Sequence, residues 1–381
     1  MEPLEQLASA LRDRLVERAR TTGDSQPIEE QVRAVIAAEA APLPDAERER
    51  LERRVLRLAT GLGPLEPLLA DPDVDEVMVN GGGAVYVERD GRLAAADARF
   101  VDAGALMHAI ERILAPLGRR VDEASPLCDA RLPDGSRVNV VIPPLAVDGP
   151  CLTIRRFRQG GFSLADLVDN GTMPGPLADH LAAAVARRAT ILVSGGTGSG
   201  KTTTLGALSG AIPEGERIVT IEDAAELLLG QPHVVRLEAR PPNVEGRGEV
   251  TIRALVRNSL RMRPDRIIVG EVRGAEALDM LMALNTGHDG SLTTVHANSP
   301  AEALRRVETL ALMADVALPH AAVRAHVADA FDLVVHQARS PDGERRVTAV
   351  AEVVRVAGAA AVRELFAMRG ERPVWRVPPG R

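Results

Sequence analysis

The residues with the clearest chemical meaning form one glycine-rich run, Gly195-Gly196-Thr197-Gly198-Ser199-Gly200-Lys201-Thr202. The run matches the pattern G-x-x-x-x-G-K-[ST] and directly follows an apolar segment at residues 191–193. Glycines let backbone N–H groups curl around phosphate oxygens, and a helix that begins after them points its positive end at the anion. The run therefore predicts a P-loop that binds ATP through Gly195, Gly196, Thr197, Gly198, Ser199, Gly200, Lys201, Thr202 and Thr203.

Lys201 is the only lysine among 46 basic residues. A position that keeps lysine where every other basic residue is arginine indicates a need for a compact ammonium group. We expect Lys201 to hold the β- and γ-phosphates, and the Thr202 hydroxyl to bind Mg²⁺.

Acidic residues follow two further apolar runs. Glu271 ends the run at residues 266–271, where Gly-Glu stands in place of the aspartate of an ordinary P-loop enzyme. It is the predicted Mg²⁺ partner, directly or through a water molecule. Glu222 and Glu226 follow the second run, and either could orient or deprotonate the attacking water.

A histidine pair lies further along the chain. The seven residues between His288 and His296 do not give a zinc spacing, and no third ligand accompanies them. The preferred functional interpretation is a neutral imidazole or a hydroxyl of this segment that contacts the γ-phosphate. On residue type alone, a hydrogen-bonded core histidine is the alternative.

Four arginines early in the chain are candidates for phosphate contacts. Arg131 and Arg137 flank a predicted hairpin, and Arg155 and Arg156 end an apolar run. They could reach the phosphates across a domain boundary and stabilise the charge there. Each of them, taken singly, could equally be an ordinary surface arginine.

The elements that position these residues alternate between helices and short apolar runs. Strands are predicted at residues 191–194, 217–221, 234–236, 266–269 and 291–296. Such alternation predicts an α/β domain, residues 164–381, with a mainly parallel sheet covered on both faces.

Upstream of that domain the pattern differs. Residues 61–158 predict a small α/β domain with hairpins at 84–93 and 130–142 and a helix at 106–117. Residues 159–163, which include Gln159-Gly160-Gly161, predict a linker. Residues 1–60 predict helices, with Leu4, Leu7, Leu11 and Leu15 on one face and breaks at 23–27 and 42–44.

Composition limits the classes of function. A formal net charge of −7 disfavours a nucleic-acid partner, because phosphate neutralisation needs concentrated positive charge. The start of the chain does not read as a signal peptide, and apolar runs are too short to span a bilayer, so we expect a cytoplasmic protein. Cys128 and Cys151 have no metal-binding spacing and are assigned no chemistry.

The motifs in this order resemble the secretion ATPase superfamily that powers type II and type IV secretion and type IV pili. The closest resemblance is to the CpaF-like branch that serves Tad/Flp pili. The match rests on residues 131–139, the P-loop, residues 221–223, 261–265 and 270–273, and the histidine-bearing segment at 286–300, and it covers roughly residues 61–340.

The resemblance implies a RecA-like motor domain behind a smaller N-terminal α/β domain, six subunits in a ring, and ATP held between the two domains. It assigns Glu222 and Glu226 to an acidic box, Glu271 to the Walker B element and His296 to a histidine box, with the four arginines approaching the phosphates. The implied partner is an inner-membrane platform protein, which would place the ring at the inner face of the cytoplasmic membrane.

Three alternatives remain. A type IV secretion or conjugation ATPase that moves protein or DNA shares the same motor motifs. A nucleic-acid motor of the RecA or helicase type is disfavoured by the net acidity, by the few aromatic residues and by the Gly-Glu element. A nucleotide-gated regulatory protein with little turnover is disfavoured because both candidate water-activating carboxylates are present.

Overall fold

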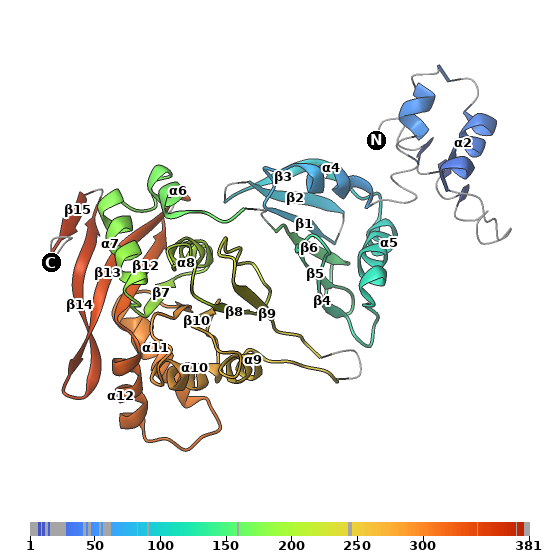
Figure 1. Ribbon diagram of the computed structural model, residues 1–381. Helices are drawn as coiled ribbons and strands as arrows, with labels where there is room; N and C mark the ends of the chain where they lie inside the picture. Colours follow the sequence, from blue (N-terminus) through green and yellow to red (C-terminus); the bar gives the residue numbers. More distant parts are fainter. Residues whose placement is uncertain are drawn as a thin grey trace. The chain divides into compact units, whose positions relative to one another are not determined.

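A computed structural model gives the fold (Figure 1). It describes residues 62–376 except 82, 90, 158–159, 243–245, 341 and 371, and within the first 61 residues only 7–8, 10–11, 14–15, 28–40, 43–44, 47–52 and 55. The chain divides into two compact units, residues 1–158 and 159–381. Leu4, the break at 23–27 and Gln159 lie outside the described residues.

The first unit contains an antiparallel six-stranded sheet in the order β3-β2-β1-β6-β5-β4. Its elements are η1 (Gly63–Leu65), α4 (Glu66–Ala70), β1 (Glu76–Asn80), β2 (Ala84–Arg89), β3 (Arg92–Arg99), α5 (Ala103–Leu114), η2 (Ala115–Leu117), β4 (Leu127–Arg131), β5 (Arg137–Val141) and β6 (Cys151–Arg155). Both predicted hairpins and the predicted helix are present.

One face of this sheet packs on α5. Asp102 caps the helix by accepting a hydrogen bond from the Ala105 N–H at 2.7 Å, and Leu106 and Ile110 are buried against the strands. Upstream, Leu11 and Leu15 are buried in a separate cluster with α2 (Ile28–Glu39) and with Leu51. Leu11 and Leu15, two residues of the apolar face predicted for the first helix, are therefore buried.

The second unit is built on a nine-stranded sheet in the order β15-β14-β13-β12-β7-β11-β10-β8-β9. Its strands are β7 (Ile191–Gly195), β8 (Ile218–Glu222), β9 (Val234–Glu238), β10 (Arg266–Val269), β11 (Leu292–His296), β12 (Leu333–Arg339), β13 (Arg345–Val356), β14 (Ala359–Arg369) and β15 (Arg372–Trp375). Its helices are α6 (Leu164–Asp169), α7 (Gly175–Ala186), α8 (Lys201–Ser209), α9 (Ile252–Ser259), α10 (Glu276–Leu284), α11 (Pro300–Leu312) and α12 (His320–Ala330).

Helices cover both faces of the parallel part of this sheet (Figure 1). Leu192 packs on the face covered by α9 to α12, whereas its neighbours Ile191 and Val193 pack on the face covered by α6 to α8. Successive strand residues point to opposite faces, so continuous apolar runs are required where both faces are covered. The mainly parallel sheet and its five predicted strands are confirmed.

Three antiparallel strands, β13 to β15, extend the sheet beyond β12. They were not predicted from the sequence, where several arginines interrupt the apolar residues of this segment. Trp375 on β15 packs edge-on against Phe366 of β14, with 5.0 Å between ring centroids. Strands β14 and β15 are therefore held together by a contact between their own aromatic side chains.

A buried arginine anchors the edge of the sheet where the parallel strands begin. Arg266 is fully buried, and its Nε donates to Glu216 at 2.6 Å while one terminal nitrogen donates to the Gly290 carbonyl at 2.9 Å. The pairing satisfies a charge that would otherwise be costly to bury. Among the described helices, none combines the length and apolar composition of a bilayer span.

Candidate nucleotide site

The P-loop lies where β7 ends and α8 begins. Gly200 has φ +91°, a left-handed conformation that favours glycine, and Lys201 starts the helix. Gly195 lies so close to β12 that a Cβ would be 2.2 Å from the Gln337 carbonyl oxygen. Ser199 is buried, and its hydroxyl donates to the Gly196 carbonyl at 2.9 Å. Thr202 and Thr203 are half-buried in the first turn of α8, and Thr197 is exposed at the tip of the loop.

Lys201 is buried under this loop. Its ammonium donates to the Gly196 carbonyl at 2.9 Å and lies 3.3 Å from Nδ1 of His296. Burial lowers the Lys201 pKa, and the nearby Glu271 carboxylate partly opposes that shift. Burial also lowers the pKa of His296, which keeps the imidazole neutral near pH 7. The structure therefore places the predicted lysine and histidine in contact.

Glu271 joins the same cluster from the end of β10. Its Oε1 lies 2.7 Å from Nε2 of His296, and its Oε2 accepts hydrogen bonds from two nitrogens of Arg273, at 2.6 and 2.9 Å. These residues lie close together because β11 and β7 are neighbouring parallel strands, with His296 on β11 in register with Gly195 on β7. Residues 195, 201, 271 and 296 thus share one edge of the sheet.

The residues present fit a hydrated Mg²⁺ ion. Oε1 of Glu271 is buried, with Nε2 of His296 2.7 Å away. A carboxylate oxygen has more than one lone pair and could also accept from a magnesium-bound water, and Mg²⁺ characteristically keeps several waters. Glu271 would hold such an ion together with the Thr202 hydroxyl.

Glu222 lies apart from this cluster: it is the last residue of β8, and its side chain packs against the loop that follows this strand. It is 3% exposed, and its Oε2 accepts hydrogen bonds from the N–H groups of Glu226 and Leu227 at 2.8 and 3.0 Å. A Cβ on Gly270 would lie 2.9 Å from Cγ of Glu222. The unusual Gly-Glu element therefore has a physical reason: glycine leaves the space that the Glu222 side chain fills.

Glu222 makes the stability of the fold depend on pH. Burial raises the pKa of this carboxyl from its ordinary 4.5 to about 7. Between those two values the native state binds a proton that the unfolded state lacks, so stability falls as the pH rises from 4.5 to 7. The full effect corresponds to about 3 kcal/mol at higher pH.

We therefore expect Glu222→Gln to stabilise the protein relative to wild type at pH 8 and to lose this advantage at pH 5. Urea unfolding of both proteins at the two pH values measures the difference. A difference between wild type and variant that is the same at both pH values would contradict the assignment.

Glu226 is half-buried, in contrast to Glu222. Both Glu226 and Asp223 lie within electrostatic range of Arg273, and Asp223 is 3.4 Å from its guanidinium. Arg273 therefore connects the acidic segment after β8 to Glu271 after β10. Arg273 belongs to the motif at residues 270–273 but was not a predicted site residue, because its two carboxylate partners follow different strands.

In the first unit, three of the four predicted arginines form a row across neighbouring strands. Arg137 on β5 lies directly opposite Arg131 on β4 and Arg155 on β6. Directly opposed residues share one face of a sheet, and like charges there are destabilising. Arg155 also lies opposite Glu76 on β1, and an anion on this face would offset the repulsion that remains among the three arginines.

Arg156 has a different environment. One of its terminal nitrogens donates to the carbonyls of Asp71 and Val74, the latter at 3.1 Å. These bonds join β6 to the segment before β1 within the first unit.

The side of the P-loop away from Glu271 carries residues that the sequence analysis missed. Gln337 on β12 accepts a hydrogen bond from the Thr204 hydroxyl at 2.6 Å, and Arg345 on β13 donates from Nε to the Gly198 carbonyl at 3.1 Å. The available signal was a pair of polar residues, His336 and Gln337, inside an otherwise apolar strand. Both are buried.

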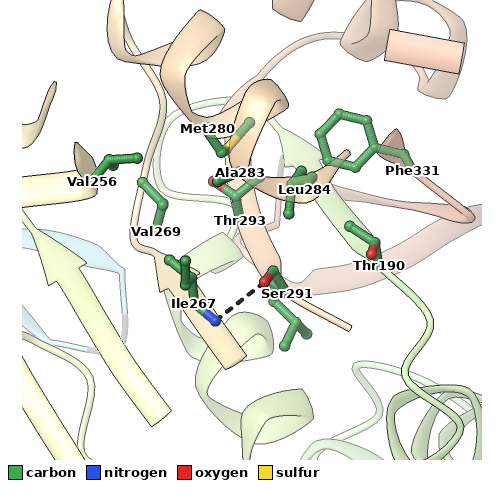
Figure 2. Close-up of a pocket in the computed structure, with 11 residues that line it drawn as sticks. Thr190, Val256, Ile267, Val269, Met280, Ala283, Leu284, Ser291, Thr293 and Phe331 are labelled. Carbon is green, nitrogen blue, oxygen red and sulfur yellow. Dashed lines mark hydrogen bonds between the residues drawn. The ribbon is translucent and has the colours of Figure 1, made fainter. Parts of the chain in front are cut away.

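A small apolar cavity lies elsewhere in the second unit. Thr190, Ser291, Val256, Met280 and Phe331 are among its lining residues, and Ser291 accepts a hydrogen bond from the Ile267 N–H at 3.2 Å (Figure 2). Thr190 and Ser291 precede β7 and β11, so the cavity is at the edge of the sheet where those strands begin. The P-loop follows the opposite edge, and the cavity is a packing gap rather than the nucleotide site.

The P-loop motif lies between a buried parallel strand and a helix, and acidic and histidine side chains lie at the same strand edge. Together these features define a RecA-like motor domain. A model of the family described as "Type II/IV secretion system protein" matches residues 58–367. The chain belongs to this family, which confirms the resemblance at the level of the secretion ATPase superfamily.

Individual relatives agree with this assignment. The chain is 44% identical over 305 residues to the putative conjugal transfer protein Rv3659c of Mycobacterium tuberculosis, covering 78% of this chain and 86% of the relative. It is 36% identical over 312 residues to the conjugal transfer protein TrbB of Rhizobium radiobacter, covering 80% and 91%. The ATPase DotB of Legionella pneumophila, 22% identical with a TM-score of 0.53 over 73% of this chain and 76% of that one, shares the fold.

Proposed function

We propose that the protein is a Mg²⁺-dependent ATPase that works as a homohexameric motor of a type IV secretion or conjugation system. The observation that carries the proposal is the cluster of Lys201, His296 and Glu271 directly behind the P-loop. Such a cluster combines a phosphate-binding cation, a neutral imidazole and a carboxylate at one sheet edge.

The residues of this chain have distinct roles in the proposed reaction. The P-loop amides and Lys201 bind the β- and γ-phosphates. Glu271 and Thr202 would hold Mg²⁺, which would neutralise developing negative charge on the phosphates. His296 contacts the γ-phosphate.

We assign water orientation to Glu226 rather than to Glu222. A general base must reach the water that it activates, and the Glu222 carboxylate is buried with Oε2 engaged by two backbone amides. Glu222 acts instead as a positioning residue, because it fixes the backbone at Glu226 and Leu227.

The row formed by Arg131, Arg137 and Arg155 is proposed to complete the phosphate site, either from the same subunit or from a neighbour in the ring. Three adjacent guanidinium groups on one face would be relieved of repulsion by a polyphosphate. ATP would then draw the two domains together, and product release would let them separate. Arg156 differs from these three because it lies outside the row and its guanidinium is engaged by two carbonyls.

Two candidate machines follow from the family. The names of the relatives, which include conjugal transfer proteins and a type IV secretion protein, favour type IV secretion or conjugation. Assembly of a Tad/Flp-type pilus is the second candidate, since the motifs at 131–139 and 261–273 resemble that branch. In either case the motor would act on inner-membrane platform proteins from the cytoplasmic side, without binding nucleic acid itself.

The purified protein is expected to hydrolyse ATP in the presence of Mg²⁺, to lose turnover in EDTA and to regain it when Mg²⁺ is restored. Steady-state phosphate release measures this, and light scattering with and without nucleotide measures the mass. A protein that binds ATP as a monomer and shows no turnover above background would favour the nucleotide-gated regulator instead.

A further inference from the structure

We propose that Arg345 is a positioning residue that presents the Ser199 N–H of the P-loop to a bound phosphate group. This inference deepens the proposed function, because it depends on the P-loop being the nucleotide site. It concerns the strand after β12, which lies outside the segments that carry the motor motifs.

The peptide between Gly198 and Ser199 is held by a side chain from outside the loop. Nε of Arg345 donates to the Gly198 carbonyl at 3.1 Å, from the β13 side of the loop. A trans peptide is planar, so its C=O and N–H point in opposite directions. Holding the carbonyl toward β13 therefore directs the Ser199 N–H away from β13, into the loop. There it makes a long hydrogen bond to the Gly196 carbonyl, at 3.4 Å, which a bound phosphate would replace.

Strand β12, with which the Arg345 strand β13 pairs, is fixed against the P-loop. Gln337 is 2% exposed, is in register with Gly195 of β7, and accepts the hydrogen bond from Thr204 in the first turn of α8. A Cβ on Gly200 would lie 2.9 Å from Nε2 of Gln337 and 3.4 Å from Cδ of Arg345. Gln337 and Arg345 thus both contact the loop at Gly200, where the absence of a side chain leaves room for them.

Charge is distributed unequally around the loop. On the β11 side of the loop, carboxylates follow β8 and β10. On the β12 side lie Arg339 and Arg345, which are directly opposite each other on β12 and β13. A Cβ on Gly198 would be 3.5 Å from a terminal nitrogen of Arg339. The guanidinium of Arg345 polarises the Gly198–Ser199 peptide in the direction that strengthens the Ser199 N–H as a donor.

Loss of the Arg345 side chain should therefore weaken the binding of any ligand that carries a diphosphate group. In Arg345→Ala, isothermal titration calorimetry should show about tenfold weaker binding of both ADP and inorganic pyrophosphate, since a charge-assisted hydrogen bond contributes about that factor. In steady-state hydrolysis KM for ATP should rise by more than kcat falls, because the contact is made in both the ground and the transition state.

Arg346→Ala is the matched control. It removes the same charge one residue away, but the side chain belongs to the opposite face of β13 and is paired with Glu344 at 2.5 Å. Its affinities should equal those of wild type. Arg345→Lys retains the charge without the planar fork and should recover only part of the loss.

Wild-type affinity in Arg345→Ala would overturn the inference, as would equal losses in Arg345→Ala and Arg346→Ala. A loss confined to ADP would also overturn it, because that pattern places Arg345 at the nucleoside. Lys201→Ala separates this inference from the proposed function: binding by wild type that is lost in Lys201→Ala keeps the P-loop site whatever Arg345 does. If the wild type binds neither ligand, the proposed function itself fails.

Discussion

Glu271→Gln is expected to lower kcat for ATP hydrolysis by about 100- to 1,000-fold while ATP binding is retained. Glutamine keeps the size of the side chain and an oxygen that can accept from Arg273, which donates to Oε2 at 2.6 and 2.9 Å. It removes the negative charge that we assign to Mg²⁺ and to the γ-phosphate region. Binding measured by calorimetry and turnover measured by phosphate release separate these two effects.

Glu214→Gln is the control for the loss of one carboxylate. Glu214 is exposed in the segment before β8, at the edge of the sheet opposite the P-loop, and its replacement should leave kcat and KM unchanged. Turnover in Glu271→Gln within threefold of wild type would remove Glu271 from the proposed reaction. Loss of both binding and turnover would instead show that the carboxylate maintains the structure of the site.

Gly195→Ala should damage both stability and activity. The new Cβ would lie 2.2 Å from the Gln337 carbonyl oxygen and 2.6 Å from the Ser199 hydroxyl, so β7 and β12 would have to separate. A backbone contact of this kind cannot relax by a rotamer change, and we expect a loss of about 3 kcal/mol, or roughly 5 to 10 °C in the apparent Tm. Displacement of the P-loop by about 1 Å should lower hydrolysis by about 100-fold.

Gly196→Ala provides a matched substitution in the same loop. A Cβ at Gly196 meets nothing within 4 Å, so this variant should melt within about 1 °C of wild type. Differential scanning calorimetry of the two variants checks the pair. Equal melting temperatures for Gly195→Ala and Gly196→Ala would show that β12 does not pack on the loop as described.

The sequence by itself determined the elements whose patterns are local. Five strands, two hairpins and the helix at α5 follow from apolar runs and turn residues, and the P-loop follows from a fixed spacing of glycines around Lys201. These signals survive because each depends on residues close together in the chain. The same holds for Glu222 and Glu271, which immediately follow apolar runs and so lie at strand ends.

Only the tertiary structure decided which residues meet across strands. The contact of Arg345 with Gly198 joins residues 147 positions apart, and the row of Arg131, Arg137 and Arg155 depends on the register of β4, β5 and β6. Register and strand order are set by packing and by long-range hydrogen bonds, which no local pattern records.

Gly270 shows how the two kinds of information combine. The sequence displayed an unusual Gly-Glu element before Val272, and the structure explains it through Glu222, a residue from another strand that fills the space beside Gly270. The sequence thus determined which chemical groups the protein has and on which strands they end. The packed sheet decided which of those groups face one another, because the order of the parallel strands brings distant chain segments to a single edge.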